Sequence, residues 1–456
     1  MNSVDFDKIC SQIDVITNEM YSLMVELFPI CRSITGNGVR QSHKIIEKQI
    51  KLQTFEIPSQ TQVFDWVVPK EWNISDAYIK DQNGNKIIDF HKSNLHVLNY
   101  SIPINKKLTL DELKPHLYSI PSQPDVIPYR TSYFKEDWGF CLSHKQLLEL
   151  TDGIYEVFID STLHDGSLTY SELYLKGKKT DEILISCYTC HPSLCNDNLS
   201  GVVLTTLLAK YLSSIELNYS YRFLFIPETI GSITWLSKNE KKLDKIKYGL
   251  VVTCVGDSGR FTYKKTRQGN TELDKIIINM LKNSNSDYTI LDFFPFGSDE
   301  RQFCSPGFNL PVGSLMRTMY TMYPEYHTSA DNLEFVKKVN FSDSLLKYLS
   351  VIFAIDNSET QKSKNIEHKN QHKSQSEEIY YMSLNPKCEP HLSKYDLYKS
   401  IGDGTNDEEK QSILWILNLS DGQNSLSDIS EKSNIKFEII KTAANRLLEK
   451  NLIKQI

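Results

Sequence analysis

A histidine and an aspartate follow one apolar run in a way that suits metal binding. The run ILISCYTC over residues 183–190 ends at His191, and Asp197 follows shortly before the next apolar stretch opens at Gly201. A buried strand has no structural need for an imidazole and a carboxylate at its end, whereas a metal site at the carboxyl edge of an α/β sheet does. The pattern predicts metal-assisted hydrolysis.

Three further residues have side chains that could join such a site. Glu228 follows the apolar run YRFLFI, Asp257 follows YGLVVTCVG, and His327 lies in YPEYHTSADN. Zinc prefers carboxylate oxygen and imidazole nitrogen, and a catalytic zinc site needs about three protein ligands and an open position. The predicted metal ligands are therefore His191, Asp197, Glu228, Asp257 and His327. Glu228 is also the predicted general base.

Each of these residues also has a local structural explanation. Asp197 and Glu228 could each cap the helix that follows, and Asp257 could form a turn with its own backbone. His191, which precedes Pro192, could simply cap the strand, and His327 could be an ordinary surface histidine. Their shared placement after strand ends favours one common site over several separate explanations.

The elements that must position these residues alternate between strand and helix after residue 153. Strands are expected at YEVFID, SELYLKG, EILISCY, YRFLFI and YGLVVTCVG, and helices over residues 201–213, after Gly231, and over 271–282 and 341–356. Earlier in the chain, residues 13–27 and 42–51 have helical spacing and LQTFEI alternates like a strand. Nearly wholly apolar strands separated by helices indicate an α/β fold with a mostly parallel sheet and helices on both faces.

Two further domains accompany this core. Residues 65–150 consist of short strand-like pieces broken by turns, which predicts a β-rich inserted domain and divides the core into residues 1–64 and 151–380. Residues 361–378 are polar and are predicted to be a linker or exposed loop. Residues 381–456 contain three helical patterns and a short strand, a succession typical of a winged helix.

The composition excludes several classes of protein. The chain of 456 residues has a formal net charge of -6 and a sequence pI near 6.0, so it has no basic field for nucleic acid or an anionic membrane. The N-terminus lacks the pattern of a signal peptide, and no apolar run is long enough to span a membrane. We therefore expect a cytoplasmic protein with reduced cysteines.

The partner classes follow from the same features. The expected substrate is a small peptide or amide. Assembly of the chain into a homo-oligomer is compatible with the sequence but is not predicted by it. The winged helix could read DNA, but its third helix mixes charges, which favours a docking or dimerisation module. Cys187 and Cys190 beside His191 could form a thiolate zinc site, but no second C-x-x-C is present to complete it.

The chain resembles the M28 family of zinc aminopeptidases, which also contains glutaminyl cyclase, at NDNLSG, at Glu228 and Asp257 after the next two strands, and at GSDERQF and YHTSADN, in this order. The resemblance covers about residues 165–355 and implies an aminopeptidase that holds one or two divalent ions, with Asp197 as the bridging ligand. The whole chain is similar to a bacterial group in which such a core carries a β-rich insertion (DUF2172-like) and a C-terminal winged helix (DUF4910-like). Segments that carry this second resemblance are CRSITGNG, IPYRTSY, WGFCL, CHPSLCNDNLSG, PETIGS and EPHLSKYDLY.

This chain departs from the M28 pattern at three places. His191 lies beyond the family position for the first histidine, and Thr229 stands where the family has the second glutamate of a Glu-Glu pair. The family aspartate aligns nearer Cys254 than Asp257.

The departures leave two outcomes open. If His191 and Asp257 bind, two metals are expected, with Asp197 bridging them and Glu228 acting mainly as base. If they do not, Asp197, Glu228 and His327 hold a single zinc as in glutaminyl cyclase.

The predicted function is hydrolysis of an amide bond next to a free amine, an aminopeptidase reaction with metal-activated water as nucleophile. Asp299, Glu300 and Tyr326 are the predicted substrate contacts. One alternative is a deacylase or amidase acting on a non-peptide N-acyl substrate such as an N-acylated sugar, with tryptophans of the insertion as stacking surfaces. Another is a non-catalytic regulator, in which a degenerate peptidase fold senses a ligand and signals through the winged helix.

Overall fold

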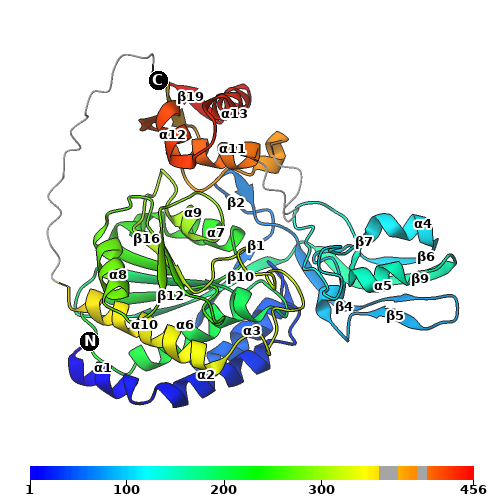
Figure 1. Ribbon diagram of the computed structural model, residues 1–456, viewed down its shortest axis with the longest axis horizontal. Helices are drawn as coiled ribbons and strands as arrows, with labels where there is room; N and C mark the ends of the chain where they lie inside the picture. The colour runs from blue at the N-terminus through cyan, green and yellow to red at the C-terminus, as the bar shows by residue number, and fades with distance from the viewer. Residues whose placement is uncertain (359–377, 398–407) are drawn as a thin grey trace.

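The computed structural model describes residues 1–358, 378–397 and 408–456. Figure 1 shows an α/β core, a β-rich insertion that extends to one side, and a small C-terminal domain above the core. Most of the predicted linker over residues 361–378 lies outside the described residues.

An eight-stranded mixed sheet forms the centre of the core, in the order β1-β10-β12-β11-β13-β16-β14-β15. The four strands β12, β11, β13 and β16 are mutually parallel, whereas antiparallel pairs lie toward both edges. The carboxyl ends of the parallel strands therefore meet at one edge, where the predicted site residues follow. The strands are β1 Gln53–Pro58, β10 Ser167–Leu175, β11 Glu182–Tyr188, β12 Ser220–Ile226, β13 Ile246–Val251, β14 Phe261–Lys264, β15 Tyr288–Leu291 and β16 Val312–Met316.

Helices cover both faces of this sheet, as its apolar strands require (Figure 1). One face packs against α2, α6, α8 and α10, and the other against α7 and α9. The helices of the core are α1 Ser3–Cys10, α2 Ile13–Leu27, α3 Asn37–Glu47, α6 Ser200–Leu212, α7 Ile230–Asn239, α8 Glu272–Lys282, α9 Glu300–Phe303 and α10 Lys338–Asp356. Most predicted helices are confirmed; α3 begins earlier than expected, because it starts directly after the turn at Gly36.

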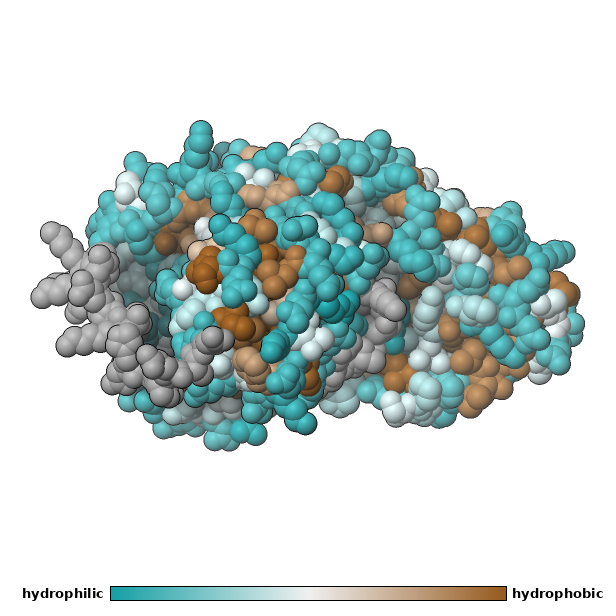
Figure 2. All heavy atoms as spheres, turned by 90° about the horizontal axis from the view of Figure 1, so that it is seen from above, coloured by the Kyte–Doolittle hydropathy of each residue, from teal (hydrophilic) through white to brown (hydrophobic). Residues whose placement is uncertain are grey.

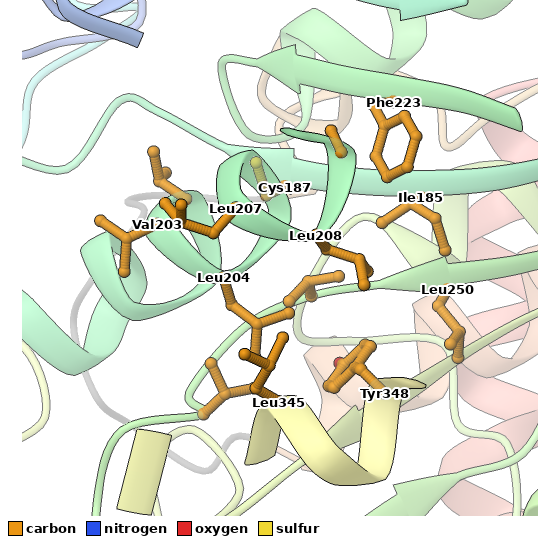
Figure 3. Close-up of a cluster of buried hydrophobic side chains, with 14 of the residues drawn as sticks. Ile185, Cys187, Val203, Leu204, Leu207, Leu208, Phe223, Leu250, Leu345 and Tyr348 are labelled. Carbon is orange, nitrogen blue, oxygen red and sulfur yellow. The ribbon is translucent and has the colours of Figure 1, made fainter. Parts of the chain in front are cut away.

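The core under α6 and α10 is close-packed. Side chains from the sheet meet side chains from both helices in Figure 3, among them Ile185, Phe223, Leu250, Leu204, Leu208, Leu345 and Tyr348. Burying one such side chain contributes about 1.5–3 kcal/mol. This layer fixes the strand ends that carry the site.

The insertion is built on a four-stranded antiparallel sheet, β5-β4-β9-β6. Strand β9 includes the segment YEVFID, which we expected in the core sheet, so the boundary at residue 150 is wrong. The reason is pairing: β9 pairs with β4 and β6 along its length, and the core sheet resumes only at β10. Its elements are β4 Glu71–Lys80, β5 Lys86–Asp89, β6 Ile104–Thr109, α4 Leu110–Leu113, β7 Leu117–Tyr118, β8 Phe140–Cys141, α5 His144–Leu148 and β9 Ile154–His164, and the hairpin β2 Gln62–Val63 and β3 Trp66–Val67 precedes it.

The C-terminal domain has the predicted three helices and terminal strand. They are α11 Glu408–Leu419, α12 Leu426–Ser433, α13 Phe437–Glu449 and β19 Ile453–Gln455. Strand β19 forms a small antiparallel sheet with β17 Tyr380–Ser383 and β18 Asp421–Ser425. This domain contacts the core directly, because Arg267 pairs with Asp421 at 2.5 Å and donates to Asn418 Oδ1 at 2.9 Å.

No helix within residues 1–358, 378–397 and 408–456 has the length and apolarity of a membrane span. Seen from the side of the C-terminal domain, hydrophobic residues form small groups among hydrophilic ones (Figure 2).

Candidate metal centre and substrate cavity

The loops after two central strands carry three of the predicted site residues. His191 and Asp197 follow β11, which ends at Tyr188, and Glu228 follows β12, which ends at Ile226. His327 comes from the long loop between β16 and α10. The parallel arrangement of β11 and β12 brings these loops to one edge of the sheet.

His191, Asp197 and His327 form a cluster whose ligand atoms all lie within 4.8 Å of one another. Asp197 Oδ2 lies 2.9 Å from His327 Nε2 and 3.9 Å from His191 Nε2. Both Asp197 Oδ2 and His327 Nε2 are buried without a hydrogen-bond partner. Two imidazoles and a carboxylate with unsatisfied buried atoms fit a zinc ion.

Glu228 stands beside this cluster. Its Oε2 atom lies 3.9 Å from His191 Nε2, and about a quarter of its side chain is exposed. Burial, together with the negative charges of Asp299 and Asp197, raises the pKa of Glu228 well above its usual value. The carboxyl group therefore sits close enough to the cluster to exchange a proton with a reacting group there.

The environment keeps the His191 imidazole neutral and the Asp197 carboxylate charged, the forms in which these groups bind metal. Burial lowers the pKa of His191 to about 4. Burial would raise the pKa of Asp197, but His191, His327 and the Tyr188 hydroxyl, which donates to Asp197 Oδ1, bring it down to about 2.

A buried carboxylate holds the loop that carries Asp197. Asp331 accepts hydrogen bonds from the backbone N–H of Asn196 at 2.6 Å and of Asp197 at 2.9 Å. Burial raises the pKa of Asp331 to about 8. Asp331 lies in the same YHTSADN segment as His327. The loop that contributes His327 to the cluster therefore also holds the loop that carries Asp197.

The insertion and the N-terminal segment hold the two histidines by their backbones. Arg32 Nε donates to the carbonyl oxygen of His191 at 2.9 Å, and Tyr129 N donates to that of His327 at 2.8 Å. Asn99 connects the two supports: its Nδ2 donates to Arg32 O at 3.1 Å, and its backbone N donates to the carbonyl of the residue after Tyr129 at 2.9 Å.

Asp257 does not join the cluster. Its carboxylate accepts hydrogen bonds from Asn196 Nδ2 at 3.0 Å, Gly259 N at 2.6 Å and Thr318 Oγ1 at 2.6 Å. These donors occupy both oxygens, so the structure gives Asp257 the turn-forming role that its GDSG context also allowed.

Asp299 and Glu300 are fully buried and do not line the cavity beside the cluster, so the structure does not support them as substrate contacts. Asp299 Oδ1 accepts from Thr229 N at 2.7 Å and from Ser232 Oγ at 2.9 Å. Glu300 pairs with the buried Lys264 at 2.5 Å.

A cavity of about 750 Å³ opens beside the cluster. Tyr326, the third predicted substrate contact, lines it and stacks on the His327 ring at 3.9 Å. Trp66 also lines it, whereas Trp72 and Trp138 are buried in hydrophobic clusters and are not among its lining residues. Other lining residues come from all three domains, including Tyr129, Tyr133, Phe134, His191, Glu228, Arg301, His327, Glu389, His391 and Leu414.

The sequence matches the family described as domain of unknown function DUF4910 over residues 21–358. The chain belongs to the DUF4910 family. This family match covers the core and the insertion, so our use of the DUF4910 name for the winged helix was wrong. The C-terminal domain matches a separate family of winged helix-turn-helix domains over residues 379–455.

Two relatives of this DUF4910 protein come from Clostridium acetobutylicum. A protein provisionally named for polysaccharide biosynthesis, with an aminopeptidase-like domain, is 54% identical over 439 residues, which is 96% of each chain. The crystal structure of a provisionally assigned peptidase is 52% identical, covers 100% of both chains and has a TM-score of 0.77.

More distant structures show the fold of the core. A zinc aminopeptidase from Bacillus subtilis has a TM-score of 0.55 at 13% identity, covering 76% of this chain and 96% of its own. An M28 peptidase precursor from Shewanella amazonensis has a TM-score of 0.54 at 12% identity, covering 79% and 98%. The DUF4910 core therefore has the aminopeptidase-like fold.

Several residues around the site were not predicted individually. Arg32, Tyr129 and Glu389 lie in the segments CRSITGNG, IPYRTSY and EPHLSKYDLY, which carry the resemblance to the wider group. Arg301 follows the Asp299–Glu300 pair directly. The segments were therefore visible as motifs, but their meeting at one cavity was not.

Proposed function

We propose that this DUF4910 protein is a metal-dependent hydrolase of amide bonds, and specifically an aminopeptidase. The observation that carries this proposal is the cluster of His191, Asp197 and His327, with Glu228 beside it at the base of a substrate-sized cavity. Three neutral or anionic ligands and an adjacent carboxyl group are the set that hydrolytic zinc sites use.

The three ligands would hold one divalent ion, zinc by the chemistry of the set. When bound, such an ion polarises the scissile carbonyl and lowers the pKa of water. Glu228 accepts the proton of the attacking water at Oε2 and returns it to the leaving amine. Thr229, in place of a second glutamate, offers no carboxylate, and Asp257 is engaged elsewhere; both support one ion rather than two.

A deacylase acting on an N-acylated sugar is the second candidate. Trp66 and Phe134 on the cavity wall favour it, because aromatic faces stack on sugar rings. The polysaccharide-related name of the Clostridium relative points in the same direction. The two candidates differ in whether the best substrate is an aminoacyl amide or an N-acyl sugar.

The winged helix supports docking better than DNA reading. On its third helix Arg446 pairs with Glu409, and just after that helix Lys450 lies 3.8 Å from Asp396. Cations engaged within the chain are less free to contact phosphates.

Metal analysis with a substrate panel tests the proposal. We expect about one zinc per chain, and cleavage of aminoacyl amides that stops when the metal is removed. Glu228→Gln should lower kcat by roughly 10²- to 10⁴-fold while the metal stays bound. A chain without bound metal, or one that cleaves no amide when loaded with zinc, would contradict the enzyme proposal and leave a ligand-sensing regulator.

A further inference from the structure

A short arm of the C-terminal region, residues 386–393, contributes its residues 389–393 to the cavity wall. Its backbone is fixed on two sides at Glu389: Glu389 N donates to Gln302 Oε1 of the core at 3.0 Å, and Trp66 Nε1 donates to Glu389 O at 2.8 Å. Both bonds use backbone atoms of Glu389. The position of this residue therefore does not depend on its own carboxylate.

Arg301 connects the Glu389 side chain to the reaction centre. Arg301 Nη2 lies 3.2 Å from Glu389 Oε1 and donates to Thr229 Oγ1 at 3.0 Å, while Nη1 donates to Gly297 O at 2.9 Å. Thr229 directly follows the proposed base, Glu228. A single guanidinium thus bridges the residue next to the base and the carboxylate of the arm.

The Glu389 carboxylate keeps an acceptor for a ligand. Arg301 engages Oε1, and within the described parts of the chain Oε2 has no hydrogen-bond partner. The Glu389 side chain lines the cavity, and 18% of its surface is exposed to solvent. A fixed, partly desolvated carboxylate with a free oxygen favours a cationic donor, and it disfavours a neutral group that cannot satisfy it.

We infer that Glu389 binds the ammonium group of the substrate and so selects amides that carry a free amine beside the scissile bond. This inference rests on the proposed aminopeptidase activity and names its specificity-determining residue. Arg301 positions that carboxylate: its Nη1 donates to Gly297 O, and its Nη2 bonds Thr229 and Glu389, while its buried Nε has no hydrogen-bond partner among the described residues. The selectivity thus comes from the C-terminal arm and not from the peptidase-like core.

The test compares zinc-loaded, full-length wild type and Glu389→Gln on an aminoacyl amide and its N-acetyl derivative. Glu389→Gln should lower kcat/KM for the free-amine amide by roughly 10- to 100-fold, the worth of one charged hydrogen bond. The inhibition constant of the N-acetyl derivative should stay unchanged. Glu389→Asp should recover part of the activity.

The matched control is Glu240→Gln, which removes the ion-pair partner of Lys387 on the outer side of the same arm. Glu240→Gln should leave unchanged both kcat/KM for the free-amine amide and the inhibition constant of the N-acetyl derivative. Equal weakening of both compounds by Glu389→Gln, or no weakening of the amide, would overturn the inference. If the wild type cleaves nothing, the proposed function has failed; calorimetric binding of the aminoacyl amide then tests Glu389 separately, and equal binding by Glu389→Gln would overturn its role.

Discussion

The cavity has two walls of different origin. The metal wall consists of His191, Asp197, Glu228 and His327, all on loops of the aminopeptidase-like core. The arm wall consists of Trp66, Phe134, Glu389 and His391, from the edge of the core, the insertion and the C-terminal arm. On the arm wall, Trp66 stacks on His391 at 4.2 Å, and Phe134 meets both rings edge-on at 5.1 and 5.0 Å.

The two walls suit different roles: the metal wall suits the reaction itself, and the arm wall suits substrate selection. The metal wall has the buried, unsatisfied ligand atoms that a reaction centre needs, and it stands at the ends of rigid strands. The arm wall has aromatic faces and one carboxylate, which suit the recognition of a substrate. We therefore expect substitutions in the metal wall to abolish turnover and substitutions in the arm wall to change which substrate is preferred.

The largest effect is expected from Asp197→Asn. The substitution removes the charge that two imidazoles share, so bound zinc should fall from about one ion per chain to none and hydrolysis to background. Elemental analysis and turnover of an aminoacyl amide measure both quantities. Asp257→Asn is the matched control, a second buried aspartate near the same loop, and it should keep its metal. If both variants lose zinc alike, Asp257 is a ligand and the two-metal arrangement returns.

An intermediate effect is expected from Arg32→Lys, which tests whether the metal wall is positioned from outside the core loops. Lysine lacks the planar fork that reaches His191 O, so zinc affinity should fall by roughly 10- to 100-fold, as for other supports of metal ligands. Competition with a chelator measures the affinity. Arg40→Lys, which weakens ion pairs with Glu56 and Glu71 away from the site, should leave the affinity unchanged. A lower melting temperature with unaltered zinc affinity would reduce Arg32 to a purely structural role.

The smallest effect is expected from the arm wall at Trp66. Trp66→Leu removes a stacking partner of His391 and a donor to Glu389 O, so KM should rise roughly twofold to tenfold with kcat and metal content retained. Trp66→Phe separates the two losses, because it keeps an aromatic face and removes only the donor. Steady-state kinetics on aminoacyl amides and N-acyl sugars measure the change. A collapse of kcat would show that the two walls are not separate in function.

The fold was predictable to the extent that its signals are local. The runs EILISCY and YRFLFI are apolar throughout, and the strands they form are buried on both faces. The winged helix was likewise visible in three helical patterns. Strand β9 was misassigned because YEVFID has the same alternation whichever sheet it joins, and its partners β4 and β6 lie far away in the sequence.

Residue types and their spacing were enough to name the candidate metal ligands, because histidine and carboxylate side chains that follow apolar strands meet at one edge of a parallel sheet. The packing of distant loops, which the sequence does not reveal, brings His191 to Asp197 and His327 and directs Asp257 to Asn196 and Thr318 instead. The end of a strand fixes the backbone position of the residue that follows it. The direction of that residue's side chain depends on loops that come from other parts of the chain and pack against it. The arm wall depended wholly on such packing, because its segments lie far apart along the chain and meet only when all three domains are folded together.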